Sequence, residues 1–387
     1  MKICILGDSL CLNSGHSKPA YELSVELIKL GIDVVFLTNE LDKEIKRKSL
    51  QLSEKYPELK KVDFITIKKF KWSEFEKDKI INKIENCDYF HFFTPSLSVI
   101  SKFTDLFPGR AIWQVTSDYL TINDLYQYGR PYLSYFFHSP KKIGNLLSKY
   151  FYKFVGRKCK TVICTTKYTH ERFLKLGFNP SKVKYIPFGV GISSGAGEKK
   201  PQASKGLVFM YFGWLSQARG FTDLQVAFER VHSELKESKL IVANPGVHLE
   251  EEKMLDNIRR SKHFSAIQIL PWQKDIAKVL KKADVIVLPF RGAFGYSQPP
   301  LVIAEAMINS KPVISTNIGS IKELIDHEKT GLLIEPGNIN DLINSMLSFA
   351  DKRRCVKMGK EAYKKIQENN WQNVISNYLE LYNVARP

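Results

Sequence analysis

One segment of the chain combines the residue types that can hold an anion and a pair of hydroxyl groups. Residues 288–307 run from an apolar strand through a glycine-bearing loop to a Pro-Pro pair and then an apolar helix. Because prolines lack an N–H group, the free amides at this helix start belong to Leu301 and Val302, with the helix dipole behind them. Glu305 lies one turn further on, where a carboxylate suits a ribose diol. The alternative for Glu305 is an ion pair with a lysine or arginine of a neighbouring domain.

Two other strand-to-helix turns carry candidate phosphate ligands. The turn at residues 213–220 begins with Gly213, which allows close backbone approach, and contains Arg219, whose guanidinium can clamp a diphosphate. The polar turn at residues 8–15 ends at Gly15 and precedes a helix, so it can hold a phosphate or a sugar. A solvent-facing arginine and an ordinary turn are the alternatives at these two places.

Strands must position these turns, and the chain alternates buried strand-like runs with helical patterns. Such runs are typical of parallel strands covered by helices on both faces. They lie at residues 2–7, 33–38, 62–67, 88–93, 110–115 and 160–165, and again at 207–213, 239–243, 266–270, 284–290, 312–316 and 332–335. We therefore expect an α/β protein with two Rossmann-like, doubly wound domains that face each other across a cleft.

The alternation breaks once, over a stretch rich in Gly, Ser and Lys that shows no periodicity. The predicted organisation is a first domain over 1–190, a linker over 191–206 and a second domain over 207–370. A last helical stretch within 371–387 follows the final strand. We expect it to cross back to the first domain.

Composition narrows the class of protein. With 387 residues, 44% of them hydrophobic and 25% charged, the chain is neither disordered nor fibrous. No apolar run reaches the roughly 20 residues of a membrane-spanning helix, and Gly7 interrupts the start before a signal-peptide core forms. The six cysteines include no C-x-x-C pair, so we expect reduced core thiols and no metal site. The expected location is the cytoplasm.

The basic excess of the chain is local. Lys and Arg number 58 against 40 Asp and Glu, and residues 129–190 hold 13 basic side chains and one acidic one, Glu171. Within residues 130–160 aromatic and basic residues alternate, which suits the surface of an anionic membrane. The alternative is a helix whose aromatics pack inward and whose lysines are solvated. No RNP, zinc-finger or G-x-x-G clamp sequence is present, so no nucleic-acid partner is expected.

Taken together, these segments resemble the retaining glycosyltransferases of family four, which have the GT-B fold. The resemblance covers nearly the whole chain. The motifs that carry it are Glu22 to Val34, Asp88-Tyr89-Phe90-His91, Ile186-Pro187-Phe188-Gly189-Val190, Phe212 to Gly220, Ala304 to Met307 with Lys311 to Ile314, and Gly319, Glu323, Leu324, Gly331 and Leu332. Gly15 matches the second glycine of the family's first loop.

The resemblance implies transfer of a sugar from a nucleotide diphosphate donor, such as a UDP- or GDP-sugar, to a hydroxyl acceptor with retention. It implies no required cofactor and usually no metal. The second domain would hold the nucleotide and the first the acceptor. By position, Arg219 replaces the lysine that neutralises the leaving diphosphate, Leu301 and Val302 supply phosphate amides, and Glu305 holds the ribose.

Three positions depart from the family pattern. Ser297 stands where the first glutamate of the E-x7-E pair is expected, Trp214 where a phosphate-loop arginine is expected, and Ser117 where many members carry a histidine. Asp118, next to Ser117, is a candidate catalytic residue together with Ser297 and Arg219. Arg291 lies in the same loop as Ser297, and we hypothesise that it restores a positive charge near the phosphates or selects an acidic sugar.

The resulting expectation is a hexosyltransferase that glycosylates a lipid-linked glycan precursor of the cell envelope at the inner face of the membrane. Its basic aromatic stretch, residues 130–160, would make the enzyme peripheral on that membrane. Two alternatives stay open: a non-catalytic partner subunit that binds a nucleotide sugar, and a GT-B sugar-nucleotide epimerase.

Overall fold

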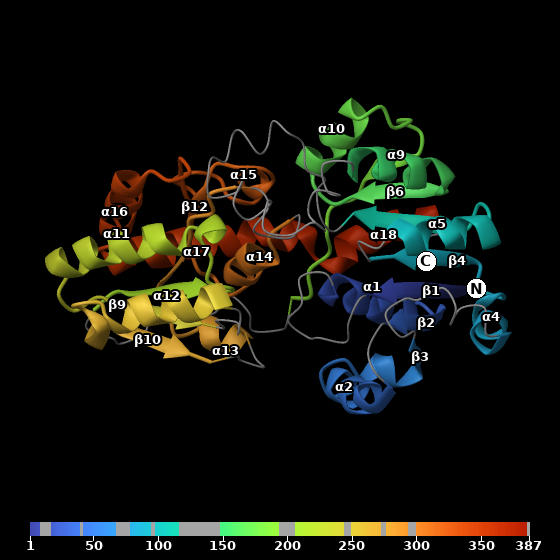
Figure 1. The fold of residues 1–387 in the computed structure, drawn as a ribbon, viewed down its shortest axis with the longest axis horizontal. Helices are drawn as coiled ribbons and strands as arrows, with labels where there is room; N and C mark the ends of the chain where they lie inside the picture. The colour runs from blue at the N-terminus through green and yellow to red at the C-terminus, as the bar shows by residue number, and fades with distance from the viewer. Residues whose placement is uncertain are drawn as a thin grey trace.

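The structure is a computed structural model of the full chain. It describes residues 1–7, 17–38, 42–66, 78–93, 97–115, 148–192, 206–243, 249–271, 276–292 and 299–384. Two domains lie side by side along the long axis of the molecule, the first in blue to green and the second in yellow to orange (Figure 1).

The first domain is built on a parallel sheet in the order β3-β2-β1-β4-β5-β6-β7. Its strands are β1 Lys2–Gly7, β2 Asp33–Thr38, β3 Asp63–Thr66, β4 Tyr89–Phe92, β5 Ala111–Val115, β6 Thr161–Cys164 and β7 Val183–Tyr185. Its helices are α1 Lys18–Lys29, α2 Asp42–Lys55, the 3-10 helix η1 Pro57–Lys61, α4 Asp78–Ile84, α5 Leu97–Leu106, α9 Ser148–Lys158 and α10 Lys167–Lys175. β7 was not predicted, because it is three residues long and two of them are exposed.

The second domain repeats the same strand order, β10-β9-β8-β11-β12-β13, again parallel throughout. Its strands are β8 Val208–Phe212, β9 Lys239–Ala243, β10 Ile267–Leu270, β11 Val285–Leu288, β12 Val313–Thr316 and β13 Gly331–Ile334. Its helices are η3 Gln217–Arg219, α11 Phe221–Glu234, α12 Leu249–Arg259, η4 Phe264–Ala266, α13 Ile276–Leu280, α14 Leu301–Ile308, α15 Ile321–Leu324, α16 Ile339–Leu347 and α17 Lys352–Ile366. The predicted pair of doubly wound domains is confirmed.

Both sheets are buried on both faces, which explains their unbroken apolar sequences. All five residues of β5 and of β8 are buried, as are all four residues of β11. The five cysteines among the described residues are buried, and no two of them form a disulfide. Within the same residues, no helix is both long and apolar enough to span a bilayer.

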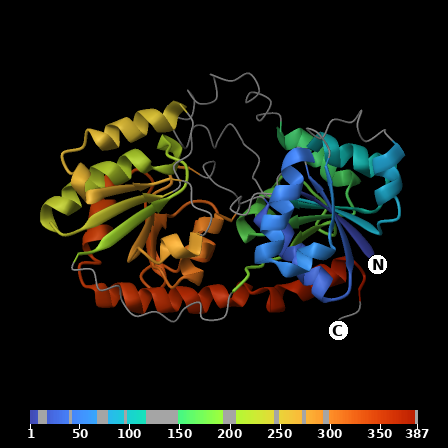
Figure 2. The same cartoon turned by 90° about the horizontal axis from the view of Figure 1, so that it is seen from below.

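The chain passes between the domains at two adjacent places. After α17 and η5 (Gln367–Asn369), helix α18 (Trp371–Leu381) packs on the first domain, and Figure 2 shows α17 and α18 in red along one side of both domains. The Val190 amide donates to the Asn369 carbonyl at 2.9 Å. Gly189 has no room for a Cβ, because the Trp371 ring lies against it. Helix α18 is thus fixed against the segment that leaves the first domain.

Candidate active site

The carboxyl ends of the two sheets meet around a cavity of about 260 Å³. Thr165 and Thr166 follow β6 of the first domain, and Ser320 follows β12 of the second. The other lining residues include Tyr185, Phe188, Pro299, Met307, Glu323, Lys365 and Asn369. Ligands of open α/β sheets bind at this end of the strands, so the cavity belongs to the predicted cleft.

One carboxylate bridges the domains at the rim of this cavity. Glu323 of α15 accepts hydrogen bonds from the backbone amides of Lys167 and Tyr168, at 2.8 and 2.7 Å. These amides open α10 in the first domain, where the positive end of the helix dipole favours a negative charge. Burial, and next the charge of Glu323, raise the pKa of Tyr185 on the same wall.

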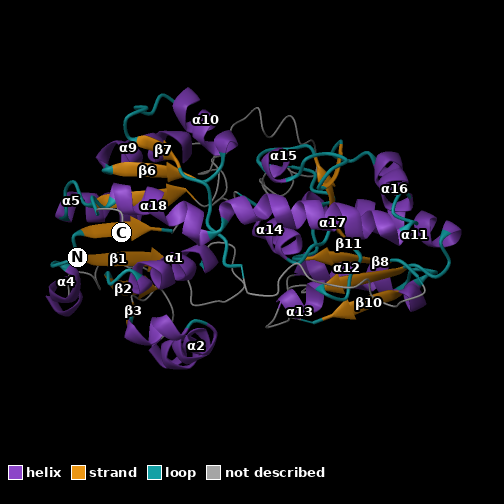
Figure 3. Cartoon of the chain, turned by 180° about the vertical axis from the view of Figure 1, so that it is seen from behind, coloured by secondary structure: helices purple, strands orange, loops and turns teal. Residues whose placement is uncertain are grey.

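Helix α14 carries the predicted ribose ligand and lies between the two sheets (Figure 3). Its first residues are Leu301 and Val302, directly after Pro300, as the sequence predicts. Glu305 points to the first domain, where it pairs with Lys18 of α1. The ion pair that we considered as the alternative for Glu305 is therefore present in this structure.

Lys18 is the shared cation of this contact. Its ammonium lies 3.6 Å from Glu22 of its own helix as well as against Glu305, and its side chain is 16% exposed. Burial lowers the pKa of Lys18, but the two carboxylates outweigh burial and raise it above the usual range. Lys18 therefore stays charged between the domains.

The turn after β8 brings Gly213 and Arg219 together. Gly213 has a φ of +124°, and a Cβ there would collide with the Arg219 guanidinium. The Ser216 hydroxyl accepts a hydrogen bond from the Arg219 amide at 3.3 Å, which closes the short turn η3. The guanidinium lies 5.6 Å from the centre of the Phe290 ring, at a distance typical of a cation–π contact. The space that a side chain would need at residue 213 is thus occupied by the Arg219 guanidinium.

Arg291, which we expected near the donor phosphates, is held by an acidic residue of the same domain. Its Nε and Nη2 donate to the two Asp223 oxygens at 2.7 and 2.5 Å, and the Asp223 side chain is 5% exposed. The Arg291 amide also donates to the Ala218 carbonyl at 2.9 Å. Arg291 thus ties the turn after β11 to the turn after β8. A further role toward a donor phosphate stays a prediction.

The other predicted site residues lie outside the described residues. These are Gly15, Asp118 and Ser297, together with Ser117. Trp214, in the position of the family's arginine, is described and is 59% exposed. Across the described ranges, no three His, Cys, Asp or Glu side chains come together as metal ligands.

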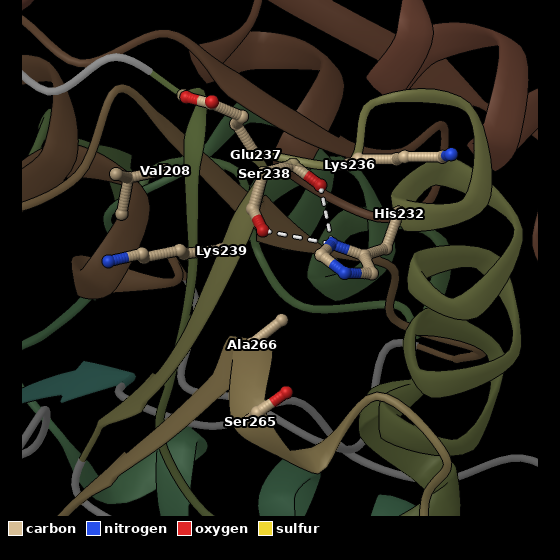
Figure 4. A pocket seen from close by; sticks show the side chains of 9 residues that line it. Val208, His232, Lys236, Glu237, Ser238, Lys239, Ser265 and Ala266 are labelled. Carbon is tan, nitrogen blue, oxygen red and sulfur yellow. Dashed lines mark hydrogen bonds between the residues drawn. The ribbon is translucent and has the colours of Figure 1, made fainter.

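A second cavity, of about 440 Å³, lies at the opposite end of the second sheet. Val208 and Lys239 line it at the amino ends of β8 and β9 (Figure 4). His232 Nδ1 lies 3.0 Å from the Ser238 carbonyl oxygen and 3.3 Å from its hydroxyl. Lys236 and Lys239 point away from each other. This cavity is separate from the cleft, and its charged side chains do not converge on a common point.

Comparison with known proteins assigns this arrangement to a class. Residues 14–193 match the sequence model described as Glycosyltransferase Family 4, and residues 206–352 match that of Glycosyl transferases group 1. Anabaena HepE in complex with UDP-glucose superposes with a TM-score of 0.75 at 16% identity over 99% of both chains. Sucrose-phosphate synthase from Thermosynechococcus elongatus gives 0.71 at 17% identity over 99% of this chain and 98% of that one. The fold is GT-B.

Curated relatives share shorter segments. The UDP-Gal:alpha-D-GlcNAc-diphosphoundecaprenol alpha-1,3-galactosyltransferase of Escherichia coli is 26% identical over 250 residues, covering 59% of this chain and 62% of that protein. The D-inositol 3-phosphate glycosyltransferase of Pseudarthrobacter chlorophenolicus is 31% identical over 113 residues, covering 29% and 26%. The matched segments span less than two thirds of these relatives' length. With family models matching both domains, the chain belongs to the family 4, or group 1, glycosyltransferases.

Proposed function

We propose that the protein transfers a hexose from a UDP- or GDP-sugar to a hydroxyl acceptor with retention of configuration. The observation that carries the proposal is that the Gly213–Arg219 turn follows β8 and the segment leading to α14 follows β11, two adjacent strands of the second sheet, so both lie at its carboxyl end. The complex of Anabaena HepE with UDP-glucose supports a nucleotide-sugar donor for this fold.

Each residue that would bind the donor has a defined task in this proposal. As the bond between the anomeric carbon and the diphosphate breaks, negative charge grows on the leaving oxygen, and the fixed Arg219 guanidinium stabilises it. Gly213 leaves room for that guanidinium beside the backbone, and Leu301 and Val302 present helix amides to the diphosphate. Glu305 accepts hydrogen bonds from the two ribose hydroxyls.

Residues of three further segments complete the proposed site. Gly15 would lie against the phosphate or sugar from the first domain. Asp118 and Ser297 would lie beside the reacting sugar. Arg291 would add a positive charge near the phosphates. No metal or cofactor is required in this scheme.

We further propose that the acceptor is a lipid-linked glycan precursor of the cell envelope. The Escherichia coli relative supports this, because its name couples UDP-Gal to a diphosphoundecaprenol acceptor. Helix α9 supports it independently. Tyr152 and Val155 pack inward, whereas Tyr150, Phe151 and Phe154 on the same helix are 63%, 59% and 53% exposed.

Two basic residues follow these exposed aromatics on α9, and one of them, Lys158, also pairs with Asp105 at 2.7 Å. Arg157 is exposed, and the Lys158 ammonium lies 4.7 Å from the centre of the Phe154 ring. Aromatic rings at headgroup depth with lysine and arginine beside them are typical of a peripheral membrane helix. We propose that this face rests on the inner, anionic surface of the cell membrane and brings the acceptor domain to its substrate.

Product analysis tests the proposed function. The purified protein is incubated with a sugar-labelled UDP- or GDP-sugar and a lipid extract of the source cells, and the lipid phase is analysed by NMR. The expected product is a glycolipid whose new linkage keeps the anomeric configuration of the donor. An epimerised nucleotide sugar formed without acceptor would instead support the epimerase alternative. Binding without turnover would support the partner-subunit alternative, which Ser297, Trp214 and Ser117 motivate.

A further inference from the structure

Three charged side chains meet where α1 of the first domain faces α14 of the second. Lys18 lies between Glu22 and Glu305, and the three side chains are 16%, 7% and 15% exposed. A single ammonium group therefore serves one carboxylate from each domain. Because all three groups are largely withdrawn from water, removal of one partner would leave a poorly solvated charge behind.

The two carboxylates differ in how they are supported. Glu22 also accepts hydrogen bonds from the Trp371 indole at 3.1 Å, and from the Tyr56 hydroxyl and the Gly191 amide at 3.3 Å each. Glu305 pairs with Lys18. If Glu305 takes another partner, Lys18 keeps Glu22, and Glu22 keeps its three further donors. No uncompensated charge is then left in the first domain.

The space beside the contact is too small for a ligand while the ion pair holds. The gap bounded by Lys18, Glu305 and the Gly189–Val190 segment has a volume of about 10 Å³. That is about the space that a single water molecule needs. A ribose cannot enter there unless the Lys18 side chain moves.

We propose that Lys18 is a positioning residue of the donor site: it holds Glu305 in the empty enzyme and competes with the donor's ribose for that carboxylate. The inference rests on the proposed function, in which Glu305 binds the ribose. Donor binding and the ion pair between α1 and α14 then exclude each other, so each donor that enters breaks one contact between the domains. The apparent nucleotide affinity is the intrinsic affinity multiplied by the fraction of molecules in which Glu305 is free of Lys18.

Isothermal titration of UDP, GDP and the matching nucleosides tests this inference. The proteins are the wild type, Lys18→Met, Lys18→Arg and Lys29→Met, with folding checked by thermal unfolding. Lys29 is the matched control, because it pairs with Glu26 on the same helix at 2.8 Å and is 49% exposed at the far end. Lys18→Met is expected to bind the nucleotide and its nucleoside three- to tenfold more tightly. Lys18→Arg and Lys29→Met are expected to bind as the wild type does.

The outcomes separate the inference from the proposed function. Equal or weaker binding by folded Lys18→Met overturns the competition. Weaker binding of the diphosphate with unchanged nucleoside binding also overturns it, because Lys18 would then be a phosphate ligand. If no variant and no wild-type protein binds any nucleotide, nucleoside or nucleotide sugar, the proposed function fails and the inference fails with it.

Discussion

Arg219 is the residue that we propose stabilises the leaving diphosphate. The Ser216 hydroxyl, the left-handed Gly220 (φ +70°) and the Phe290 ring all restrict it, so its charge is in place before a substrate arrives. A charge that needs no reorganisation during the reaction is the most effective kind of electrostatic stabilisation.

Substitution of Arg219 tests this role. Arg219→Ala is expected to lower kcat by about two to three orders of magnitude, as for the loss of one fixed donor to a developing anion. Arg219→Lys restores the family's residue and is expected to keep most of the activity. The rate of nucleoside diphosphate release measures both. An unchanged kcat in Arg219→Ala would show that another group neutralises the diphosphate.

Arg291 and Asp223 form the second residue-scale test. Arg291→Ala leaves the buried Asp223 carboxylate without its two guanidinium donors and is expected to lower the free energy of unfolding by about 2 kcal/mol. The double variant Arg291→Gln/Asp223→Asn is expected to recover part of this loss. Urea unfolding gives both values. If the double variant unfolds like the wild type but binds the donor much more weakly, Arg291 also contacts the phosphates.

The sequence predicts where several site residues lie but not which side chains they pair with. Motif spacing is enough to bring Gly213 and Arg219 into one turn and to start α14 at Leu301. It does not give the partner of Arg291, which is 68 positions away, nor that of Glu305, which is 287 positions away. These pairs depend on how turns and domains pack, and a lysine such as Lys18 has no local feature that distinguishes it from a solvated one.

At the scale of elements, the buried parallel strands were predictable because each is a continuous apolar run. The bounds of β1, β2 and β9 agree with the sequence prediction, and most of the other strands begin or end one or two residues inside it. The short edge strand β7 lacks such a run: its burial comes from Val183 alone. Helix α9 combines both interpretations of its sequence, with one aromatic packed inward and three exposed.

The exposed face of α9 gives a prediction for membrane binding. Phe151→Ser/Phe154→Ser is expected to weaken binding to phosphatidylglycerol-containing vesicles by roughly tenfold or more, because each buried aromatic contributes about 1–2 kcal/mol. Leu50→Ser/Val226→Ser is the matched control, since these side chains are 65% and 46% exposed on other helices. Vesicle co-sedimentation measures the effect. Equal loss in both double variants would contradict a specific α9 contact.

Helix α18 is attached to the first sheet through a buried polar network. His91 Nε2 donates to the Gln114 side-chain oxygen at 3.2 Å, and the Tyr382 hydroxyl donates to His91 Nδ1 at 2.5 Å. Tyr378 also donates to the Gln114 oxygen, at 3.2 Å. Burial lowers the pKa of His91 to about 3. His91 is therefore neutral in the folded protein at any ordinary pH.

This network predicts an acid sensitivity with a definite sign. Below the unfolded pKa of 6.5, the unfolded chain binds a proton at His91 that the folded chain refuses, so stability falls as the pH drops from 6.5 toward 3. Between pH 7 and pH 5 the wild type is expected to lose about 2 kcal/mol more than His91→Gln. Urea unfolding at the two pH values measures the difference. Equal losses would show that His91 is not the titrating group.

At the scale of the whole molecule, two Rossmann-like domains meet through a few specific contacts beside a double crossing of the chain. Glu323 of the second domain caps α10 of the first, and Lys18 of the first domain pairs with Glu305 of the second. The two-domain architecture follows from the repeated alternation in the sequence. The contacts between the domains cannot be predicted in this way, because the sequence around a charged side chain does not show whether it faces the other domain or the solvent.

The central claim is that this molecule turns over a nucleotide sugar, and nucleoside diphosphate release tests it most directly. The purified protein is assayed with a panel of UDP- and GDP-sugars, with and without lipid extract from the source cells. We expect release from one donor, rising sharply when the lipid extract is added. No release from any donor, while one nucleotide still binds tightly, would contradict the claim and make the protein a nucleotide-sugar-binding subunit.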